Sequence, residues 1–147
     1  MHVEFAVNSD IEPMADLLHE LFTLESDFRP RREKQLAALR WLMVHPDHGR
    51  LFVLRDGNHV VGMANALISI STAEGGPVLI LEDVIVAASH RGSGYGRLLV
   101  EHVLRWAAGA GMSRVTLLAD KDNSAALSFY YKLGFEESAM VVRRKRP

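Results

Sequence analysis

The chain of 147 residues has the length of one globular domain and can bury a hydrophobic core. It has no cysteine, which excludes disulfides, thiolate catalysis and cysteine-bound metal, and its formal net charge of −1 provides no overall positive field for nucleic acid. No apolar run reaches the length of a membrane span and no secretory signal opens the chain. We therefore expect a single domain over residues 1–147 in a soluble, cytoplasmic protein.

The N-terminal third predicts one strand and two helices. Alternating apolar residues from Val3 to Val7 are typical of a half-buried strand. The segment Ser9–Glu12 has the pattern of a capping box and leads into a helix that runs to about Leu24. After Pro30, apolar residues at helical spacing from Leu36 to Met43 predict a second helix.

The middle of the chain predicts three consecutive strands. A strand over Leu51–Arg55 and a longer one over His59–Ser71 flank an Asp-Gly-Asn turn. A glycine-rich loop over Thr72–Pro77 follows. The next run, Val78–Val86, is almost wholly apolar, as expected of a central strand that is buried on both faces.

The last third predicts two helices and two strands. We expect a helix from Tyr95 to about Ala110, a strand over Arg114–Ala119, a helix over Ser124–Leu133 and a final strand over Ser138–Arg143. The full order is β-α-α-β-β-β-α-β-α-β. This order predicts an α/β fold with a central mixed sheet and helices on both of its faces.

The segment from Val86 to Gly96 places a strand, a glycine-rich turn and a helix start in succession. Glycines at 92, 94 and 96 leave the backbone N–H groups open to phosphate oxygens, and Arg91 adds a positive charge. The spacing differs from a dinucleotide-binding fingerprint, and the Gly-Lys-Ser/Thr ending of a P-loop is missing. From the glycines alone, a tight structural turn is the alternative.

Two motifs specify the site further. Arg91–Gly96 resembles the R/Q-x-x-G-x-G/A signature of the GNAT family of acyl-CoA N-acyltransferases, and Asn123–Phe135 resembles its N-x-x-A-x-x-x-Y-x-K-x-G-F segment. The resemblance follows the element order throughout and is sharp from about Leu81 to Phe135. It implies a GNAT fold in which the strands at Leu81–Val86 and Arg114–Ala119 splay apart around the pantetheine arm. It also implies acetyl-CoA as co-substrate and no metal.

Acetyl transfer to an amine requires a neutral amine, a polarised carbonyl, a protonated leaving thiolate and aligned reactants. We expect Glu82 as the base, because it interrupts an apolar strand where a carboxylate is costly to bury. Strand alternation places Ile80, Glu82, Val84 and Val86 on one face, and Asp83 on the other. Asp83 is the second candidate, acting through water or holding the substrate. A purely structural carboxylate is the alternative for Glu82.

The resemblance implies Tyr130 as the acid that protonates the departing sulfur. Tyr131 lies about 100° further round the helix, so the two tyrosines cannot both face the cofactor. A packed aromatic residue is the alternative for Tyr130, a plain helix N-cap for Asn123 and a solvated lysine for Lys132. The expected cofactor-binding residues are Val84, Ile85, Val86, Arg91, Gly92, Ser93, Gly94, Tyr95, Gly96, Asn123 and Lys132.

The acceptor side carries fewer signals. Arg29 and Arg32 lie between the first two helices and are candidates for binding an anionic acceptor such as a sugar phosphate, with a solvated basic loop as the alternative. The seven histidines show no metal-binding spacing. The apolar segment Met140–Val142 permits a homodimer through the last strand.

Three functions remain open at this point. The favoured one is an acetyl-CoA-dependent N-acetyltransferase for a small amine. The second is the same chemistry on a protein N-terminus or lysine. The third is a non-catalytic acyl-CoA sensor. A closed acceptor pocket formed by residues 24–34 and 70–77 would favour the small molecule.

Overall fold

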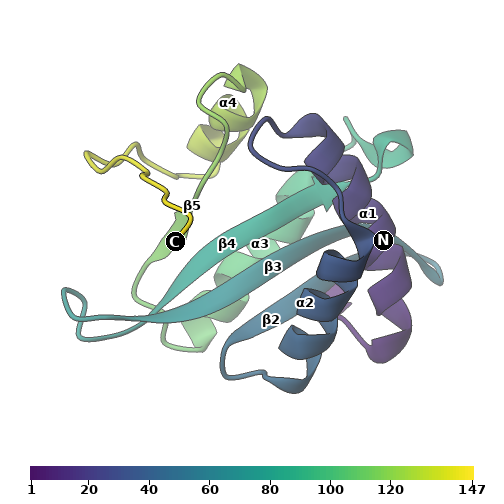
Figure 1. The fold of residues 1–147 in the computed structure, drawn as a ribbon, viewed down its shortest axis with the longest axis horizontal. Helices are drawn as coiled ribbons and strands as arrows, with labels where there is room; N and C mark the ends of the chain where they lie inside the picture. The colour runs from purple at the N-terminus through teal and green to yellow at the C-terminus, as the bar shows by residue number, and fades with distance from the viewer.

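The computed structural model describes residues 1–147 and contains one five-stranded mixed sheet in the order β1-β2-β3-β4-β5 (Figure 1). The strands are β1 (His2–Phe5), β2 (Gly49–Asp56), β3 (His59–Ser71), β4 (Gly76–Val86) and β5 (Val115–Leu117). The helices are α1 (Ile11–Leu24), α2 (Arg32–Val44), α3 (Tyr95–Gly109) and α4 (Ser124–Lys132), with short 3-10 helices η1 (Asn8–Asp10) and η2 (Ala88–His90). No helix combines the length and the apolar character needed to cross a membrane.

The sheet parts at one end. Strands β1 to β4 pair antiparallel, whereas β4 and β5 run parallel and pair only from Leu79↔Val115 to Leu81↔Leu117. Beyond Leu81 the two strands diverge, and α4 stands at that open end (Figure 1). The predicted splay of the two strands is confirmed. Residues 82–86 of β4 therefore have no strand partner on their β5 side.

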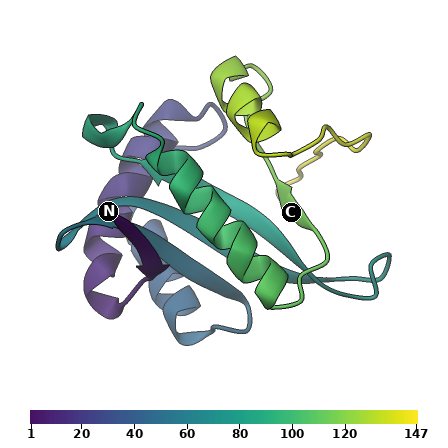
Figure 2. The same cartoon turned by 180° about the vertical axis from the view of Figure 1, so that it is seen from behind.

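Helices cover both faces of the sheet, as predicted. On one face α1 buries Met14, Leu17 and Leu18 at the spacing of one helix side, in a core shared with β2 and β3. On the other face α3 packs Leu99 and Val103 against the sheet (Figure 2). The site lies where the ends of these two layers meet α4.

The predicted final strand over Ser138–Arg143 is wrong. This segment has no regular secondary structure, and Val141 and Val142 stay exposed. Its neighbour Arg144 instead forms an ion pair with Asp27 and lies with its guanidinium 5.3 Å from the Phe28 ring centroid. The tail is thus held by the loop after α1 and not by the edge of β5.

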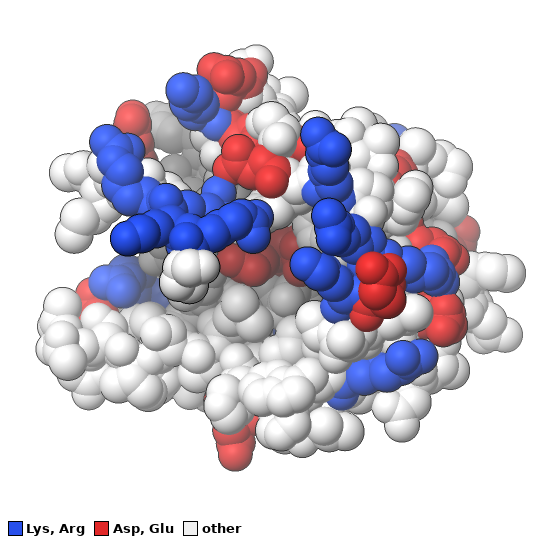
Figure 3. Space-filling model, viewed as in Figure 1, with Lys and Arg blue, Asp and Glu red and all other residues white.

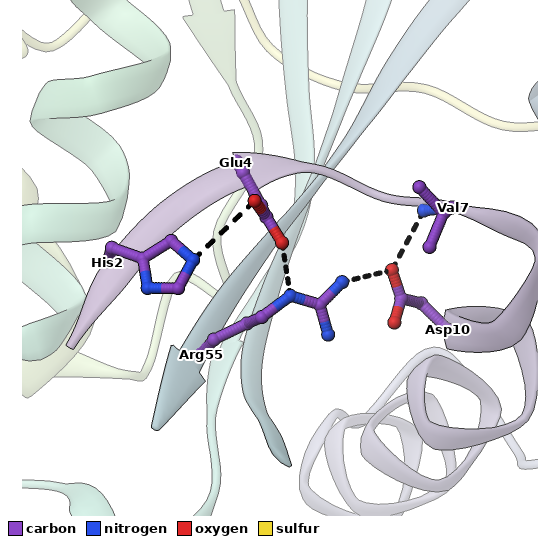
Figure 4. A network of polar contacts seen from close by, with 5 residues as sticks. All are labelled: His2, Glu4, Val7, Asp10 and Arg55. Atoms are coloured by element: carbon purple, nitrogen blue, oxygen red, sulfur yellow. Dashed lines mark hydrogen bonds and ion pairs between the residues drawn. The ribbon is translucent and has the colours of Figure 1, made fainter. Parts of the chain in front are cut away.

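The predicted capping box at Ser9–Glu12 is also wrong. The chain first forms η1, and the backbone N–H of Val7 donates to Asp10 Oδ2 at 2.8 Å. The same oxygen accepts from Arg55 Nη2 at 2.7 Å, and Glu4 pairs with the other side of that guanidinium (Figure 4). Arg55 on β2 therefore fixes the start of α1, an interaction distant in sequence that local patterns do not reveal.

A β-bulge in β4 changes which side chains share a face. The register between β3 and β4 slips between Met63 and Asn65, and Asp83 takes a φ of 53°. As a result Val84 and Val86 join Leu81 in the core under α3. The predicted grouping of Glu82 with Val84 and Val86 is therefore wrong, because simple alternation assumes a strand without a bulge.

Candidate functional site

A cavity of about 540 Å³ lies between the end of β4, the glycine-rich turn and α4. Val84, Ile85 and Val86 form one wall, at the place where β4 has lost its partner β5. The other lining residues are Leu21, Leu24, Arg91, Gly92, Gly94, Tyr95, Gly96, Arg97, Ala126, Phe129, Tyr130, Lys132 and Leu133. Both sequence motifs thus meet in one cavity.

Glycine is required at the positions of this turn for conformational and steric reasons. Gly92 and Gly94 have φ values of 79° and 81°, a region that other residues rarely adopt, and Gly94 is the N-cap of α3. Gly96 lies against α4, since a Cβ there would stand 3.4 Å from the Phe129 ring. The N-terminus of α3 opens on this turn, which suits it to bind a phosphate group.

The remaining predicted cofactor residues have different positions. Arg91 lines the cavity, but its Nε donates to the Val86 carbonyl at 2.7 Å and its other side pairs with Glu20 on α1. Lys132 lines the cavity. Asn123 caps α4 by accepting from the Ala126 N–H at 3.0 Å, and neither it nor Ser93 is among the residues that line the cavity.

Tyr130 is half-buried in the wall of this cavity, whereas 74% of Tyr131 is exposed. Burial, with the nearby negative charge of Glu25, raises the pKa of the Tyr130 phenol to about 12. The phenol therefore keeps its proton at neutral pH. Tyr130 lines the cavity, and Tyr131 does not.

A second cavity of about 480 Å³ lies beside the first, on the face shown in Figure 3. That view shows a hollow with acidic side chains in its depth and Lys and Arg side chains at its rim. The cavity is formed by the loop after α1, the end of β5 and the C-terminal tail. Its lining residues are Glu25, Ser26, Asp27, Phe28, Leu118, Ala119, Asp120, Lys121, Asp122, Val141, Val142, Arg143 and Arg144.

Glu25, at the end of α1, lies between the two cavities. It lines the second cavity, while the preceding Leu24 lines the first. Burial, together with the negative charges of Asp83, Asp120, Glu82 and Asp27, raises the pKa of Glu25 to about 7. Sequence reasoning missed Glu25, because no motif or periodicity separates it from the other glutamates of the chain.

Asp83 is the only residue other than glycine with a positive φ, and its carboxylate is largely buried. The pKa of Asp83 is raised to about 6, because burial and the charge of Glu82 outweigh the hydrogen bond from Asn65, which lowers it. Asn65 Nδ2 donates to Asp83 Oδ2 at 3.3 Å. Glu82, Asp83 and Glu25 therefore form one group of interacting carboxylates, which strand alternation did not predict. Glu82 and Asp83 line neither cavity, but their charges act on Glu25, which lines the second one.

The predicted acceptor arginines lie elsewhere. Arg32 begins α2 and pairs with Glu12 at 2.6 Å and with Asp16 at 2.7 Å. Arg29 is exposed, and neither residue lines the two cavities. The Thr72–Pro77 segment is the tip of the β3–β4 hairpin, which projects away from α4 (Figure 1). In place of that segment, the end of β5 and the C-terminal tail line the second cavity.

The comparisons agree with this architecture. The chain is 30% identical over 131 residues to the uncharacterized N-acetyltransferase YobR of Bacillus subtilis (strain 168), covering 89% of this chain and 49% of that protein. It is 29% identical over 120 residues to the mycothiol acetyltransferase of Parafrankia sp. (strain EAN1pec), covering 82% and 34%. The chain thus spans about half the length, or less, of these relatives.

Among solved structures, one from Clostridium difficile 630 superposes with a TM-score of 0.90 at 16% identity, covering 99% of this chain and 97% of that chain. This likeness shows the fold. The family model described as the Acetyltransferase (GNAT) family matches residues 12–135, which include both motifs and all the residues that line the first cavity. The chain therefore belongs to the GNAT family of acetyltransferases.

Proposed function

We propose that this protein is an N-acetyltransferase that moves an acetyl group from acetyl-CoA to a primary amine of a small molecule by direct attack. The observation that carries the proposal is the junction of two cavities at Tyr130 and Glu25. One cavity has the glycine turn and the free edge of β4, and the other is acidic. A proton donor and a proton acceptor stand between them.

The first cavity fits acetyl-CoA. When bound, acetyl-CoA supplies an acetyl group activated as a thioester. Backbone groups at residues 82–85 of β4 lack a strand partner and are available to the pantetheine amides, whereas the Val86 carbonyl accepts from Arg91 Nε. The N–H groups at the turn and at the start of α3 suit the pyrophosphate, and Lys132 provides a positive charge at the same cavity.

The carboxylates provide the base. The sequence predicts Glu82, and the structure adds Glu25 and favours it as the proton acceptor. Glu25 is the carboxylate whose charge acts on Tyr130, and its raised pKa of about 7 suits proton transfer near neutral pH. The charge of Glu82 helps to raise that pKa. Glu25 would take the proton from the attacking amine and pass it to water through the second cavity.

Tyr130 provides the acid. Its pKa of about 12 keeps the phenol protonated, so that it can give its proton to the departing thiolate. Alignment of the two reactants across the junction supplies much of the remaining rate increase. No covalent enzyme intermediate is needed.

The second cavity supports a small acceptor. The loop after α1 and the C-terminal tail close it on two sides, tied together by Arg144 with Asp27. Ser26 bonds to Asp120 across the same space, with its Oγ 3.2 Å from Oδ2. A relative in the comparison is a mycothiol acetyltransferase, which supports a small-molecule acceptor here as well.

The proposal is tested by titrating acetyl-CoA calorimetrically and by following thiol release with a panel of amines and peptides. We expect acetyl-CoA binding and thiol release with small amines. Release only with N-terminal or lysine peptides would replace the small acceptor by a protein. Binding of acetyl-CoA without release for any amine would point to a sensor and contradict the proposal.

A further inference from the structure

Three features that destabilise a protein occur together at the bulge of β4. Asp83 has a positive φ, its carboxylate is largely buried, and Asn65 Oδ1 is buried without any hydrogen-bond partner. Asn65 as a whole is 7% exposed. Such a concentration of costs within one site is expected where a ligand supplies what is missing.

The missing component is a positive charge with N–H donors. None of the ion pairs in the structure includes Glu25, Glu82, Asp83 or Asp120. A buried carboxylate without a counter-charge is unfavourable, and two of these four have raised pKa values for that reason. An alkylammonium group offers both the charge and three donors.

The chain does not provide that cation itself. Arg144 at the rim is held by Asp27, and Arg143 Nη1 donates to the Val142 carbonyl at 3.1 Å. Lys121 lines the second cavity without an ion pair to the carboxylates. The basic rim is therefore separate from the acidic depth seen in Figure 3.

Asn65 acts on this group through Asp83. Its Nδ2 donates a hydrogen bond to one oxygen of the Asp83 carboxylate, while its Oδ1 accepts none. An apolar side chain of similar shape would avoid the unpaired oxygen but would also remove the donor to Asp83, so the distinct contribution of the amide is the orientation of the Asp83 carboxylate.

We propose that Asp83 binds the ammonium group of the acceptor and that Asn65 is a positioning residue that holds the Asp83 carboxylate for it. The ligand class is an aliphatic amine that carries a positive charge in solution. The inference rests on the proposed function, because it assigns the amine side of the same site. It names Asn65 as a specificity-determining residue outside both family motifs.

The first test compares acceptor kinetics in Asn65→Leu, Asp83→Asn and the wild type, with butylamine as the charged acceptor and aniline as an amine that is neutral at pH 7. In both variants the KM for butylamine should rise about 10- to 100-fold, the range of a lost hydrogen bond to a charged group. The preference for butylamine over aniline should fall by a similar factor. Glu33→Gln, an exposed change on α2, is the matched control.

Stability separates this role from a structural one. Asn65→Leu removes the unpaired oxygen and the donor to Asp83 together, so its unfolding midpoint should change little while its KM for butylamine rises. A loss of stability with unchanged KM for butylamine would overturn the proposal, and so would an unchanged preference between the two amines in both variants.

A cation that cannot be acetylated keeps the inference separate from the proposed function. The tertiary amine dimethylbutylamine should bind the wild-type protein and release protons, measured by calorimetry in buffers of different ionisation enthalpy, because a cation lowers the raised carboxyl pKa values. Asp83→Asn should abolish the binding. Thiol release from butylamine without these effects would leave the proposed function standing and contradict the ammonium site. Cation binding without thiol release would support the site and contradict the function.

Discussion

Glu25 and Glu82 can each accept the proton of an attacking amine, and the pH profile distinguishes them. Asp83, Asp120 and Asp27 also face Glu25, so that its pKa reflects the whole group of carboxylates. If Glu25 is the base, Glu82→Gln removes one of the negative charges that raise its pKa. The acid limb of kcat/KM then moves to lower pH. If Glu82 is the base, the same change moves activity to higher pH, because the amine must deprotonate in bulk water.

The measurement is kcat/KM for butylamine from pH 5 to 9 in Glu82→Gln, Glu25→Gln and the control Glu33→Gln. We expect the acid limb to move down in Glu82→Gln and to be lost in Glu25→Gln. An upward shift in Glu82→Gln would restore the assignment that the sequence predicts. Unchanged profiles in both would show that neither carboxylate accepts the proton.

Tyr130→Phe removes the phenolic proton while it keeps the ring in the wall of the cofactor cavity. We expect kcat to fall by roughly 10²–10⁴-fold, the usual contribution of general acid catalysis, with acetyl-CoA affinity unchanged. Tyr131→Phe is the control, since that side chain is exposed. Equal turnover in the two variants would remove Tyr130 from the proposed chemistry.

At the scale of single residues, the sequence predicts those functional residues that lie within the two motifs. The sequence identifies Tyr130, because it stands at a fixed distance before Gly134 in the second motif. Glu25 and Asp120 were missed, because their burial arises only when the end of α1 meets the end of β5. Asn123 caps α4, which is the alternative to a cofactor contact that the sequence left open for it.

Among the elements, the role of the glycine-rich turn in acetyl-CoA binding can be tested separately. Gly94→Val should weaken acetyl-CoA binding about tenfold or more, because a β-branched residue is strained at the φ of 81° and its side chain would stand at the phosphate site. Gly111 has a φ of 78° at the far end of α3, so Gly111→Val is a control with the same backbone strain. Calorimetry should show lost binding only for Gly94→Val. A similar loss in both would mean that strain, and not the site, explains the effect.

The start of α1 depends on an ion pair with little exposure. In Asp10→Ala, the Arg55 guanidinium loses its buried partner and Val7 loses an acceptor. The free energy of unfolding should fall by about 3 kcal/mol, as found when one member of a buried pair is removed. Denaturant titration measures this. Glu4→Gln, which alters the exposed side of the same network, should have a much smaller effect (Figure 4). Equal losses would contradict the role of burial.

Most elements follow from periodicity, and the exceptions have physical causes. The helices over Ile11–Leu24 and Tyr95–Gly109 match their predicted ranges, because their apolar residues recur with the helical period. The bulge at Asp83 and the unpaired tail depend on contacts between distant segments. A short apolar segment such as Met140–Val142 forms a strand only if a sheet edge receives it, and here Asp27 and Phe28 bind its neighbour Arg144 instead.

For the whole molecule, the raised carboxyl pKa values predict how stability depends on pH. Glu25 and Asp83 have pKa values of about 7 and 6 in the folded protein, against 4.5 and 3.8 as reference values. Between these values the folded state binds more protons than the unfolded state, so this contribution to stability falls as pH rises from about 4 to 7. Denaturant titrations of the wild type and Glu25→Gln should converge at low pH, with the variant more stable at pH 7. A variant that loses stability at pH 7 would contradict the unfavourable charge.

The arrangement of layers explains why both cavities lie at one end of the sheet. Strands β1 to β4 form a continuous antiparallel framework, and only β5 departs from it (Figure 2). The departure exposes the free edge of β4 to one cavity and leaves room for the acidic cavity beside it. The family motifs report the first cavity. The second cavity is built from loops and the C-terminal tail, which carry no motif, so the sequence does not predict its acidic lining.

The most direct test of the account is thiol release from acetyl-CoA in the presence of butylamine, with mass spectrometry of the amine. The account predicts that free CoA and N-acetylated butylamine form in equal amounts, and that Glu25→Gln and Tyr130→Phe reduce both together. Thiol release without an N-acetylated product, or no release from any amine by a protein that binds acetyl-CoA, would contradict it.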